Sequence, residues 1–469
     1  MYAQLDTGSW ELWVNPSCSS LTSSADKTFC QAVGQYDPDE SSSSETTSET
    51  KKLNYGIGNA EIDYFVDDIA LSDSVKLQSV QFGVASDTED QFAGVLGIGY
   101  GKGVNTRYNN FIDELAGQGI TKTKAFGVAL GSKTEDGGVI TFGGVDTGKF
   151  KGRLASLPIM SPNDAPDGVA RYWVNLDSVS HTSSSGKNSK WDDTSMPVFL
   201  DTGATLTLLP PSVVETIATD LGSDGQDDAG FYNLDCGLVN EAGTVDFAFD
   251  GVTIKVPYKE IIREFGGSSP ACYLGISPSE DYALLGDTFL RSAYVVFDLD
   301  SDTVFMAQYE NCGSEVSSIE SSDDLDGLSG SCGGGDKEFE EEQEEEEKSN
   351  EEEEQEEEED DNDEPAETTS SAKLAATESP LPVVTEIATT VSGTTSTFSS
   401  TITTLSKPTP TPTETGSSEE DPDQATDGGD QSTSGNDENV DSAASRSRYN
   451  SGTKTLLGIG AGTMIMLML

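Results

Sequence analysis

Short apolar runs, separated by polar and glycine-rich stretches, recur through the first two thirds of the chain. Alternating or continuous runs of hydrophobic residues predict β-strands, and the clearest are Val139–Phe142, Val245–Phe249, Val252–Val256 and Tyr294–Leu299. Helical periodicity is rare and short, at Phe111–Ala116 and Pro211–Leu221. The 48 glycines suit a protein with many turns. The pattern therefore predicts an all-β fold, mostly antiparallel.

One sequence context occurs twice in this region. Asp6-Thr7-Gly8 follows an apolar residue and leads into an apolar run, and so does Asp201-Thr202-Gly203, 195 residues later. Each is followed by two apolar residues and a glycine: Gly97 stands 91 residues after Asp6, and Gly286 stands 85 residues after Asp201. Such a repeat predicts two similar lobes, at residues 1–155 and 156–312, each large enough to bury a core. A third triplet, Asp146-Thr147-Gly148, lacks this context and predicts an ordinary turn.

With these motifs, residues 1–312 resemble the pepsin-type aspartic endopeptidases, and most closely the fungal yapsin group, which is attached to the cell surface. The resemblance implies a two-lobed fold in which the two Asp-Thr-Gly loops face each other across a pseudo-twofold axis. It also implies that Asp6 and Asp201 are the catalytic residues. Further matching stretches are Tyr36-Asp37-Pro38, Tyr55-Gly56-Ile57-Gly58, Phe92–Gly97 and Leu284–Arg291.

The chemistry requires these residue types. Two carboxyls a few ångströms apart cannot both ionise, so they share one proton over an acidic range, as aspartic proteases themselves illustrate. In the family the ionised member takes a proton from a bound water, and the other member protonates the peptide carbonyl. The resemblance gives Thr7 and Thr202 the task of fixing the geometry, while Gly8 and Gly203 allow close approach of the backbone. Ser9 would hydrogen-bond Asp6, whereas its counterpart Ala204 has no hydroxyl, which favours the ionised form at Asp6.

Tyr55 matches the tyrosine of the family's flap, a hairpin that closes over bound peptide and excludes water. Its ring would lie near Trp13. The simpler alternative is that both are ordinary strand aromatics, but the flanking Gly56 and Gly58 favour the flap.

Composition excludes several other kinds of hydrolase. The single histidine, His181, lies in a serine-rich stretch without a partner pattern, so we expect a surface loop residue and neither a Ser-His-Asp site nor a His-Glu-x-x-His zinc site. No lysine-containing phosphate loop is present. With the resemblance, we expect a monomer that acts on protein or peptide substrates, with no cofactor, no metal and no nucleic-acid partner.

Six cysteines are present. The resemblance implies the lobe disulfides Cys18–Cys30 and Cys236–Cys272, and hence an oxidising, secretory compartment. Cys312 and Cys332 are left over, and they either pair at the start of the tail or remain free thiols. The only Asn-x-Ser/Thr triplet, at Asn15, contains proline, so N-glycosylation is not expected.

Residues 313–455 predict a disordered stalk. A large part of the net charge of −58 lies in the nearly continuous Glu and Asp run from 337 to 364, which cannot bury enough apolar surface to fold. The Ser/Thr/Pro-rich stretch from 368 to about 415 is typical of an O-glycosylated stalk, although an inert linker is the alternative.

Residues 456–469 form an apolar run of 14 residues, too short to span a bilayer comfortably and without a basic anchor after it. The run predicts a signal for a glycosylphosphatidylinositol (GPI) anchor, with Ser442 or Asn450 as the candidate attachment site. This places the expected protein outside the cell, on the plasma membrane or cell wall, by way of the secretory pathway.

Two features leave alternatives open. Members of the family carry further strands ahead of the first Asp, whereas this chain reaches Asp6 almost at once, so we expect either an incomplete sequence or a poorly folding, inactive form. A catalytically inactive cell-wall or adhesion protein is thus one alternative, and an acidic binding protein whose Glu-rich segment engages basic partners is another. Acidic residues after the flap could favour basic substrate side chains, or could simply be solvated: Glu61, Asp63, Asp67 and Asp68.

Overall fold

A computed structural model describes most of the first 333 residues and two later strands. Residues 16–17, 19–23, 73–74, 90, 92, 136, 266–270 and 334–469 are not described, apart from the backbone of residues 398–405 and 462–466. The described part is mostly β-structure with a few short helices, as the apolar pattern predicts. No helix within it combines the length and the apolar character needed to cross a membrane.

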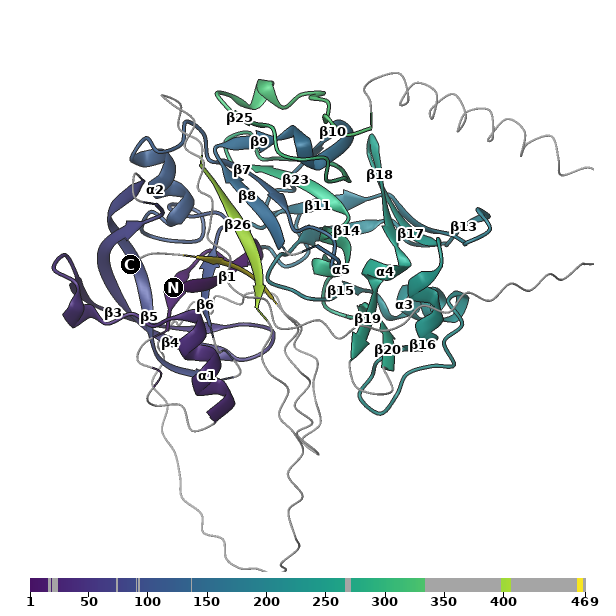
Figure 1. Cartoon of the computed structure of the whole chain (residues 1–469), viewed down its shortest axis with the longest axis horizontal. Helices are drawn as coiled ribbons and strands as arrows, with labels where there is room; N and C mark the ends of the chain where they lie inside the picture. Colours follow the sequence, from purple (N-terminus) through teal and green to yellow (C-terminus); the bar gives the residue numbers. More distant parts are fainter. Residues whose placement is uncertain are drawn as a thin grey trace, which may run out of the picture.

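The first lobe is built from hairpins and carries the first Asp-Thr-Gly loop at the end of its first strand (Figure 1). Its strands are β1 (Tyr2–Asp6), β2 (Leu12–Val14), β3 (Glu45–Asn54), β4 (Asn59–Ala70), β5 (Lys76–Glu89), β6 (Gly94–Gly97), β7 (Ala125–Ala129), β8 (Gly137–Phe142), β9 (Gly144–Asp146) and β10 (Phe150–Pro158). Its helices are α1 (Ser24–Val33) and α2 (Phe111–Gly117), with 3-10 turns η2 (Pro38–Glu40) and η3 (Thr147–Lys149).

The second lobe repeats the plan, with the second Asp-Thr-Gly loop directly after β14. Its strands are β11 (Trp173–Leu176), β12 (Ser178–Thr182), β13 (Asn188–Lys190), β14 (Met196–Leu200), β15 (Thr207–Leu209), β16 (Asn233–Leu234), β17 (Thr244–Phe249), β18 (Val252–Pro257), β19 (Ile262–Phe265), β20 (Ala271–Leu274), β21 (Ile276–Pro278), β22 (Leu284–Leu285), β23 (Ala293–Asp298) and β24 (Thr303–Tyr309). Its helices are α3 (Pro211–Asp220), α4 (Tyr258–Ile261) and α5 (Asp287–Leu290), with the 3-10 turn η4 (Cys236–Asn240).

The two lobes share a sheet. Strand β23 pairs antiparallel with β7 of the first lobe and with β24, and β24 pairs in turn with β10. Phe126 of β7 stacks on Phe297 of β23 with ring centroids 5.0 Å apart, inside an apolar core that continues through both lobes. The boundary expected between residues 155 and 156 falls inside β10, because this strand completes the shared sheet and does not connect two separate bodies.

The strand and helix predictions agree with the structure, and the differences have local causes. The strong apolar runs lie in β8, β17, β18 and β23, and the two helical signals are α2 and α3. Helix α1 was not predicted, since it is short and half of its residues, SADKTFCQAV, are polar. His181 is not a loop residue: it lies in β12, stacked on Trp191, with Tyr258 hydrogen-bonded to its Nε2 atom.

All six cysteines pair. The structure contains the Cys18–Cys30 and Cys236–Cys272 disulfides, and Cys312 and Cys332 form a third. The residues between this last pair are folded, which corrects the expectation of a disordered stalk from 313: β25 (Val316–Ser318) pairs with β9, and the 3-10 turn η5 (Ser322–Asp324) follows. The part of the stalk from 334 onward lies outside the described residues, except for one strand.

Two strands from the C-terminal third enter the shared sheet. Strand β26 (Phe398–Leu405) pairs with β8 and with β27 (Gly462–Met466), and β27 pairs with β1 (Figure 1). The sheet is thereby continuous from β10 to β3. These strands belong to the segments expected to be a stalk and a removable tail, and here both take part in backbone pairing.

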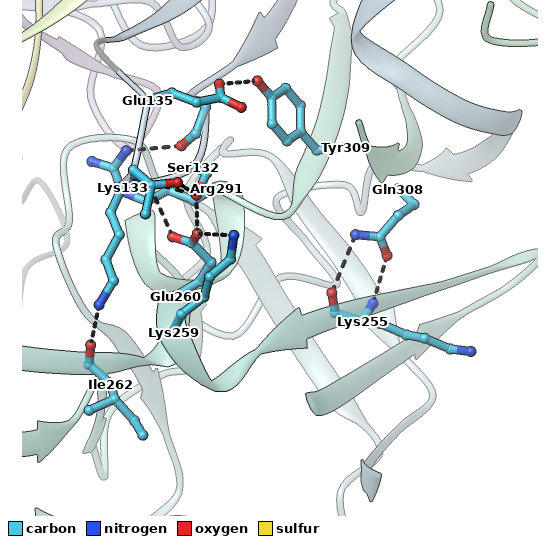
Figure 2. A network of polar contacts seen from close by, with 12 residues as sticks. Ser132, Lys133, Glu135, Lys255, Lys259, Glu260, Ile262, Arg291, Gln308 and Tyr309 are labelled. Atoms are coloured by element: carbon cyan, nitrogen blue, oxygen red, sulfur yellow. Dashed lines mark hydrogen bonds and ion pairs between the residues drawn. The ribbon is translucent and has the colours of Figure 1, made fainter. Parts of the chain in front are cut away.

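A polar network fastens the loop after β7 to the second lobe (Figure 2). Glu260, buried in α4, accepts hydrogen bonds from the Ser132 hydroxyl and from the Lys133 backbone N–H at 3.1 Å. Arg291 donates to the carbonyl of Gly131 at 3.0 Å, and Tyr309 donates to Glu135 at 2.6 Å. A single buried carboxylate therefore satisfies two donors from the other lobe.

Replacing Glu260 by Ala should lower the free energy of unfolding by roughly 2 kcal/mol, because two donors lose a charged acceptor in a buried place. The measurement is the midpoint and slope of urea unfolding. Glu264→Gln is the matched control, since Glu264 is half exposed and pairs with Lys133 at 3.0 Å, where an ion pair contributes under about 1 kcal/mol. Equal stability of both variants and the unchanged protein would contradict the role given to Glu260.

Candidate active site

Each candidate catalytic aspartate follows a strand that runs parallel to an apolar-Gly strand of the same lobe. Strand β1 pairs with β6, so that Asp6 lies opposite Gly97, and β14 pairs with β22, where Leu200 lies opposite Leu285. The backbone N–H of Asp201 then donates to the Leu285 carbonyl at 3.0 Å. The strands are apolar and buried, whereas the loops that follow them carry the carboxyls to the place where the lobes meet.

The two loops are joined by reciprocal hydrogen bonds of their threonines. The backbone N–H of Thr7 donates to the Thr202 hydroxyl at 3.1 Å, and that of Thr202 donates to the Thr7 hydroxyl at 2.9 Å. Each hydroxyl then donates across the interface, Thr7 to the Leu200 carbonyl and Thr202 to the Leu5 carbonyl, at 2.8 and 2.9 Å. All four bonds are buried, so the spacing of the loops is fixed without any contribution from the carboxyls.

The glycines of the triplets allow the carboxyls to approach the opposite loop. A Cβ atom on Gly8 would lie 2.6 Å from the Asp201 carboxyl, and one on Gly203 would lie 2.5 Å from Oδ1 of Asp6. The backbone N–H of Gly8 also donates to Asp6 at 2.8 Å, and that of Gly203 donates to Asp201 at 2.9 Å. Any side chain at either glycine would therefore displace a carboxyl.

The two carboxyls have unequal surroundings. Burial raises the pKa of Asp6, but hydrogen bonds from the Ser9 hydroxyl at 2.5 Å, from Asp201 and from the Gly8 N–H oppose this. Burial also raises the pKa of Asp201, and there the neighbouring Asp6 charge raises it further. Ala204 offers no counterpart of the Ser9 hydroxyl. The pair thus shares a proton that resides preferentially on Asp201.

A long hairpin formed by β3 and β4 carries the candidate flap residues. At its tip the Tyr55 N–H donates to the Gly58 carbonyl at 3.0 Å, and Gly58 has a positive φ of 82° that suits glycine. The indole N–H of Trp13 donates to the Tyr55 hydroxyl at 2.6 Å, and Gly56 follows Tyr55 in the turn. Burial raises the pKa of Tyr55 well above its usual value, and the charge of Asp6 adds to this.

Two other sequence-predicted residues lie away from the dyad. Asp146 of the third triplet is buried, and its carboxyl accepts hydrogen bonds from the backbone N–H groups of Gly148 and Glu315 at 3.1 and 2.6 Å and from the Ser314 hydroxyl at 2.7 Å. It therefore holds a turn, as expected. His181 contacts Trp191 and Tyr258 and takes no part in the site.

Several residues near the dyad were not found from the sequence. Arg171 donates a hydrogen bond to the carbonyl of Gly8. Burial raises the pKa of Tyr282, and the charge of Asp201 raises it further. Glu11, buried below the flap, accepts hydrogen bonds from Tyr64 at 3.0 Å and from Tyr108, and pairs with Lys51 at 2.8 Å. None of these belongs to a repeated motif, and Arg171 is 163 residues from the loop it contacts. Among the described residues, no group of three His, Cys, Asp or Glu side chains is placed to hold a metal.

Comparison with known proteins agrees with this geometry. The chain is 35% identical over 318 residues to a probable aspartic-type endopeptidase, opsB, of Aspergillus oryzae, covering 65% of this chain and 64% of that protein. It is 35% identical over 316 residues to candidapepsin-3 of Candida albicans, with 65% and 75% covered, and 33% identical over 324 residues to candidapepsin of Candida tropicalis, with 67% and 77% covered.

The chain thus spans somewhat less than two thirds of the Aspergillus protein. The family model of the eukaryotic aspartyl proteases matches residues 2–309, a span that contains both Asp-Thr-Gly loops, the flap hairpin and the strands β7, β10, β23 and β24 that join the two lobes. With two lobes that each bring one buried aspartate to a common dyad, this chain belongs to the eukaryotic aspartyl protease family.

Proposed function

We propose that the protein is an aspartic endopeptidase that cleaves protein or peptide substrates at acidic pH, with Asp6 and Asp201 as its catalytic residues. The observation that carries the proposal is the direct contact of two buried carboxyls on loops joined by the Thr7 and Thr202 hydrogen bonds. Family membership and the similarity to an aspartic-type endopeptidase and to candidapepsins support it.

In this mechanism a water lies between the two carboxyls. Asp6, whose ionised form Ser9 and Gly8 support, takes a proton from the water as it attacks the peptide carbonyl. Asp201 donates its proton to the carbonyl oxygen, and the resulting tetrahedral intermediate collapses as the leaving nitrogen is protonated. The flap, with Tyr55, Gly56 and Trp13, covers the bound peptide and excludes solvent. The attacking group is water, so no covalent enzyme intermediate forms.

We also propose that the enzyme is secreted and tethered to the plasma membrane or cell wall through a GPI anchor, as in the yapsin group, and acts as a monomer. Three disulfides and the similarity to secreted aspartic proteases of Candida albicans support a secretory route. The apolar segment 456–469 supports the anchor. Attachment at Ser442 or Asn450 would remove that segment, and strand β27 would leave β1 with it.

A preference for basic substrate side chains is the last part of the proposal. Asp63 supports it, because it is exposed on β4 of the flap hairpin. Glu61 is exposed on the same strand and adds less, since it pairs with Lys52 at 3.5 Å. Asp67 and Asp68 do not, since Asp67 is buried and accepts from Tyr36 and Ser43 at 2.7 and 2.6 Å, and Asp68 pairs with Lys76 at 2.9 Å. The negative potential offered to a substrate is thus smaller than the sequence alone indicates.

The dyad is tested with the variants Asp6→Asn and Asp201→Asn of the full-length protein. Each change should lower kcat/KM on a fluorogenic peptide at acidic pH by at least about 1,000-fold, since base and acid are both needed. Pepstatin-type inhibitors, whose hydroxyl takes the place of the water, should block the unchanged enzyme. Asp146→Asn is the control and should keep nearly full activity, and appreciable turnover by either dyad variant would exclude the mechanism.

Specificity is tested with a peptide library, in which cleavage next to Lys or Arg should predominate. Replacing Glu61 and Asp63 together by Gln and Asn should then reduce cleavage at basic sites by several-fold and leave apolar sites unchanged. Replacing Asp68 by Asn gives the matched control. A library profile with only large apolar residues at the cut bond would contradict the preference.

The anchor is tested by fractionation. The expressed protein should sediment with membranes, be released by phosphatidylinositol-specific phospholipase C, and enter the medium when residues 456–469 are deleted. Mass spectrometry of the mature protein should find its C-terminus at Ser442 or Asn450. An intact Leu469 in phospholipase-resistant protein would instead show that the segment stays in the chain, where β27 pairs with β1.

A further inference from the structure

Arg171 is a buried cation that reaches from the start of the second lobe to the first catalytic loop. Its side chain is 2% exposed, and its Nη1 atom donates to the carbonyl oxygen of Gly8, two residues after Asp6. Its Nε atom donates to the Asp167 carboxylate at 2.8 Å. The guanidinium thus joins a loop of one lobe to the dyad loop of the other.

Two aromatic rings hold the guanidinium in place. Its central carbon lies 5.4 Å from the ring centre of Trp10 and 5.5 Å from that of Phe199, within the range of cation–π attraction. Trp10 is buried, and within the described part of the chain its indole N–H has no hydrogen-bond partner. The ring of Trp10, like that of Phe199, faces the guanidinium.

Asp167 fixes the direction of the arginine. One carboxylate oxygen accepts from Arg171, and the other accepts from the Trp173 indole N–H at 3.1 Å and from the Val169 backbone N–H at 3.0 Å. The arginine is therefore clamped on its outer side by Asp167 and directed on its inner side toward the dyad loop.

The charges near the dyad favour a cation at this place. A singly ionised pair of Asp6 and Asp201 carries one negative charge in a buried site, which is costly without a compensating charge. Tyr55 on the flap and Tyr282 before β22 are the other titratable groups that face the dyad, and both are neutral below pH 9 because burial and the carboxylates raise their pKa values. Arg171 is thus the only cation found beside the dyad in the described residues.

We propose that Arg171 is a positioning residue of the dyad, which anchors the first catalytic loop through Gly8 and compensates the negative charge of the singly ionised pair. The inference rests on the proposed peptidase function. Although burial raises the pKa values of Asp6 and Asp201, the Arg171 charge lowers both, as this role requires. The arginine allows the ionised pair to persist to lower pH, where the enzyme would otherwise be doubly protonated and inactive.

The acid limb of the pH profile tests this role, because a merely structural residue would not move it. Activity is lost on that limb as the pair takes up its second proton, so removing a nearby positive charge should shift the midpoint upward by about one pH unit. The alkaline limb of the pH profile is less suitable as a test. Burial raises the pKa of Asp287 to about 7, so ionisation of Asp287 would overlap with the loss of activity on that limb.

The variants separate charge from contact. Arg171→Met removes the charge and keeps an apolar chain between the two rings, and Arg171→Gln removes the charge but keeps a donor for Gly8. Both should shift the acid limb of kcat/KM upward by about one unit. Arg171→Lys keeps the charge, so the midpoint of its acid limb should stay within about 0.3 pH units of the unchanged enzyme. Its kcat should fall several-fold, because lysine cannot contact Asp167 and Gly8 in the same way. Arg107→Met, at an exposed arginine, changes the net charge equally and should leave the limb unmoved.

The outcomes separate this inference from the proposed function. An inactive unchanged enzyme would refute the peptidase function itself. The unchanged enzyme could instead be active while its neutral Arg171 variants lose activity equally at every pH, with the acid limb unmoved. Arg171 would then be a packing residue, and the inference would be overturned. Failure of both neutral variants to fold while Arg171→Lys folds would likewise assign a structural role and count against it.

Discussion

Two carboxyls are buried face to face in this molecule, and the loops of both lobes have to hold them there. Neither carboxyl could remain in such a place if both were charged, because buried like charges repel strongly. The pair therefore shares a proton, and the distance between the two carboxyls must be kept constant. The Thr7 and Thr202 bonds provide that constraint through backbone and hydroxyl groups alone, and the glycines at 8 and 203 leave the space. The geometry of the site is therefore set by the backbone and the threonine hydroxyls, and it does not depend on the charge of the carboxyls.

The sequence predicted those features that are local and repeated. The apolar runs identified β17, β18 and β23, and the duplicated Asp-Thr-Gly contexts predicted two similar lobes, because each depends on a short stretch of chain. The resemblance added that the two loops face each other. The Trp13–Tyr55 contact was predicted through the resemblance, and the structure has their hydrogen bond. These elements account for most of the fold and for the centre of the site.

What escaped prediction depends on contacts between distant residues. His181 lies in a polar stretch, yet Trp191 and Tyr258 enclose it on β12, and nothing in the local sequence indicates those neighbours. Arg171 precedes an aromatic pair and looks like an ordinary strand-end cation, whereas its partner at Gly8 is brought there by the meeting of the lobes. The folding of residues 313–333 was missed for a related reason: Asp146, from the triplet without catalytic context, supplies the carboxylate that holds them.

The Cys312–Cys332 disulfide has a mechanical consequence. Strand β24 ends at Tyr309, and the chain then pairs with β9 through β25. It returns to β10, where the backbone of Cys332 pairs with that of Lys151 in an isolated β-bridge. A pull on the chain beyond Gly333 would be transmitted through the covalent link to Cys312 and so to the end of β24, without passing through the folded residues between the two cysteines. Because β24 lies between β10 and β23 in the shared sheet, the load would be spread over many backbone hydrogen bonds at once. Tension from the proposed C-terminal tether would therefore reach the shared sheet without acting directly on the two loops of the dyad.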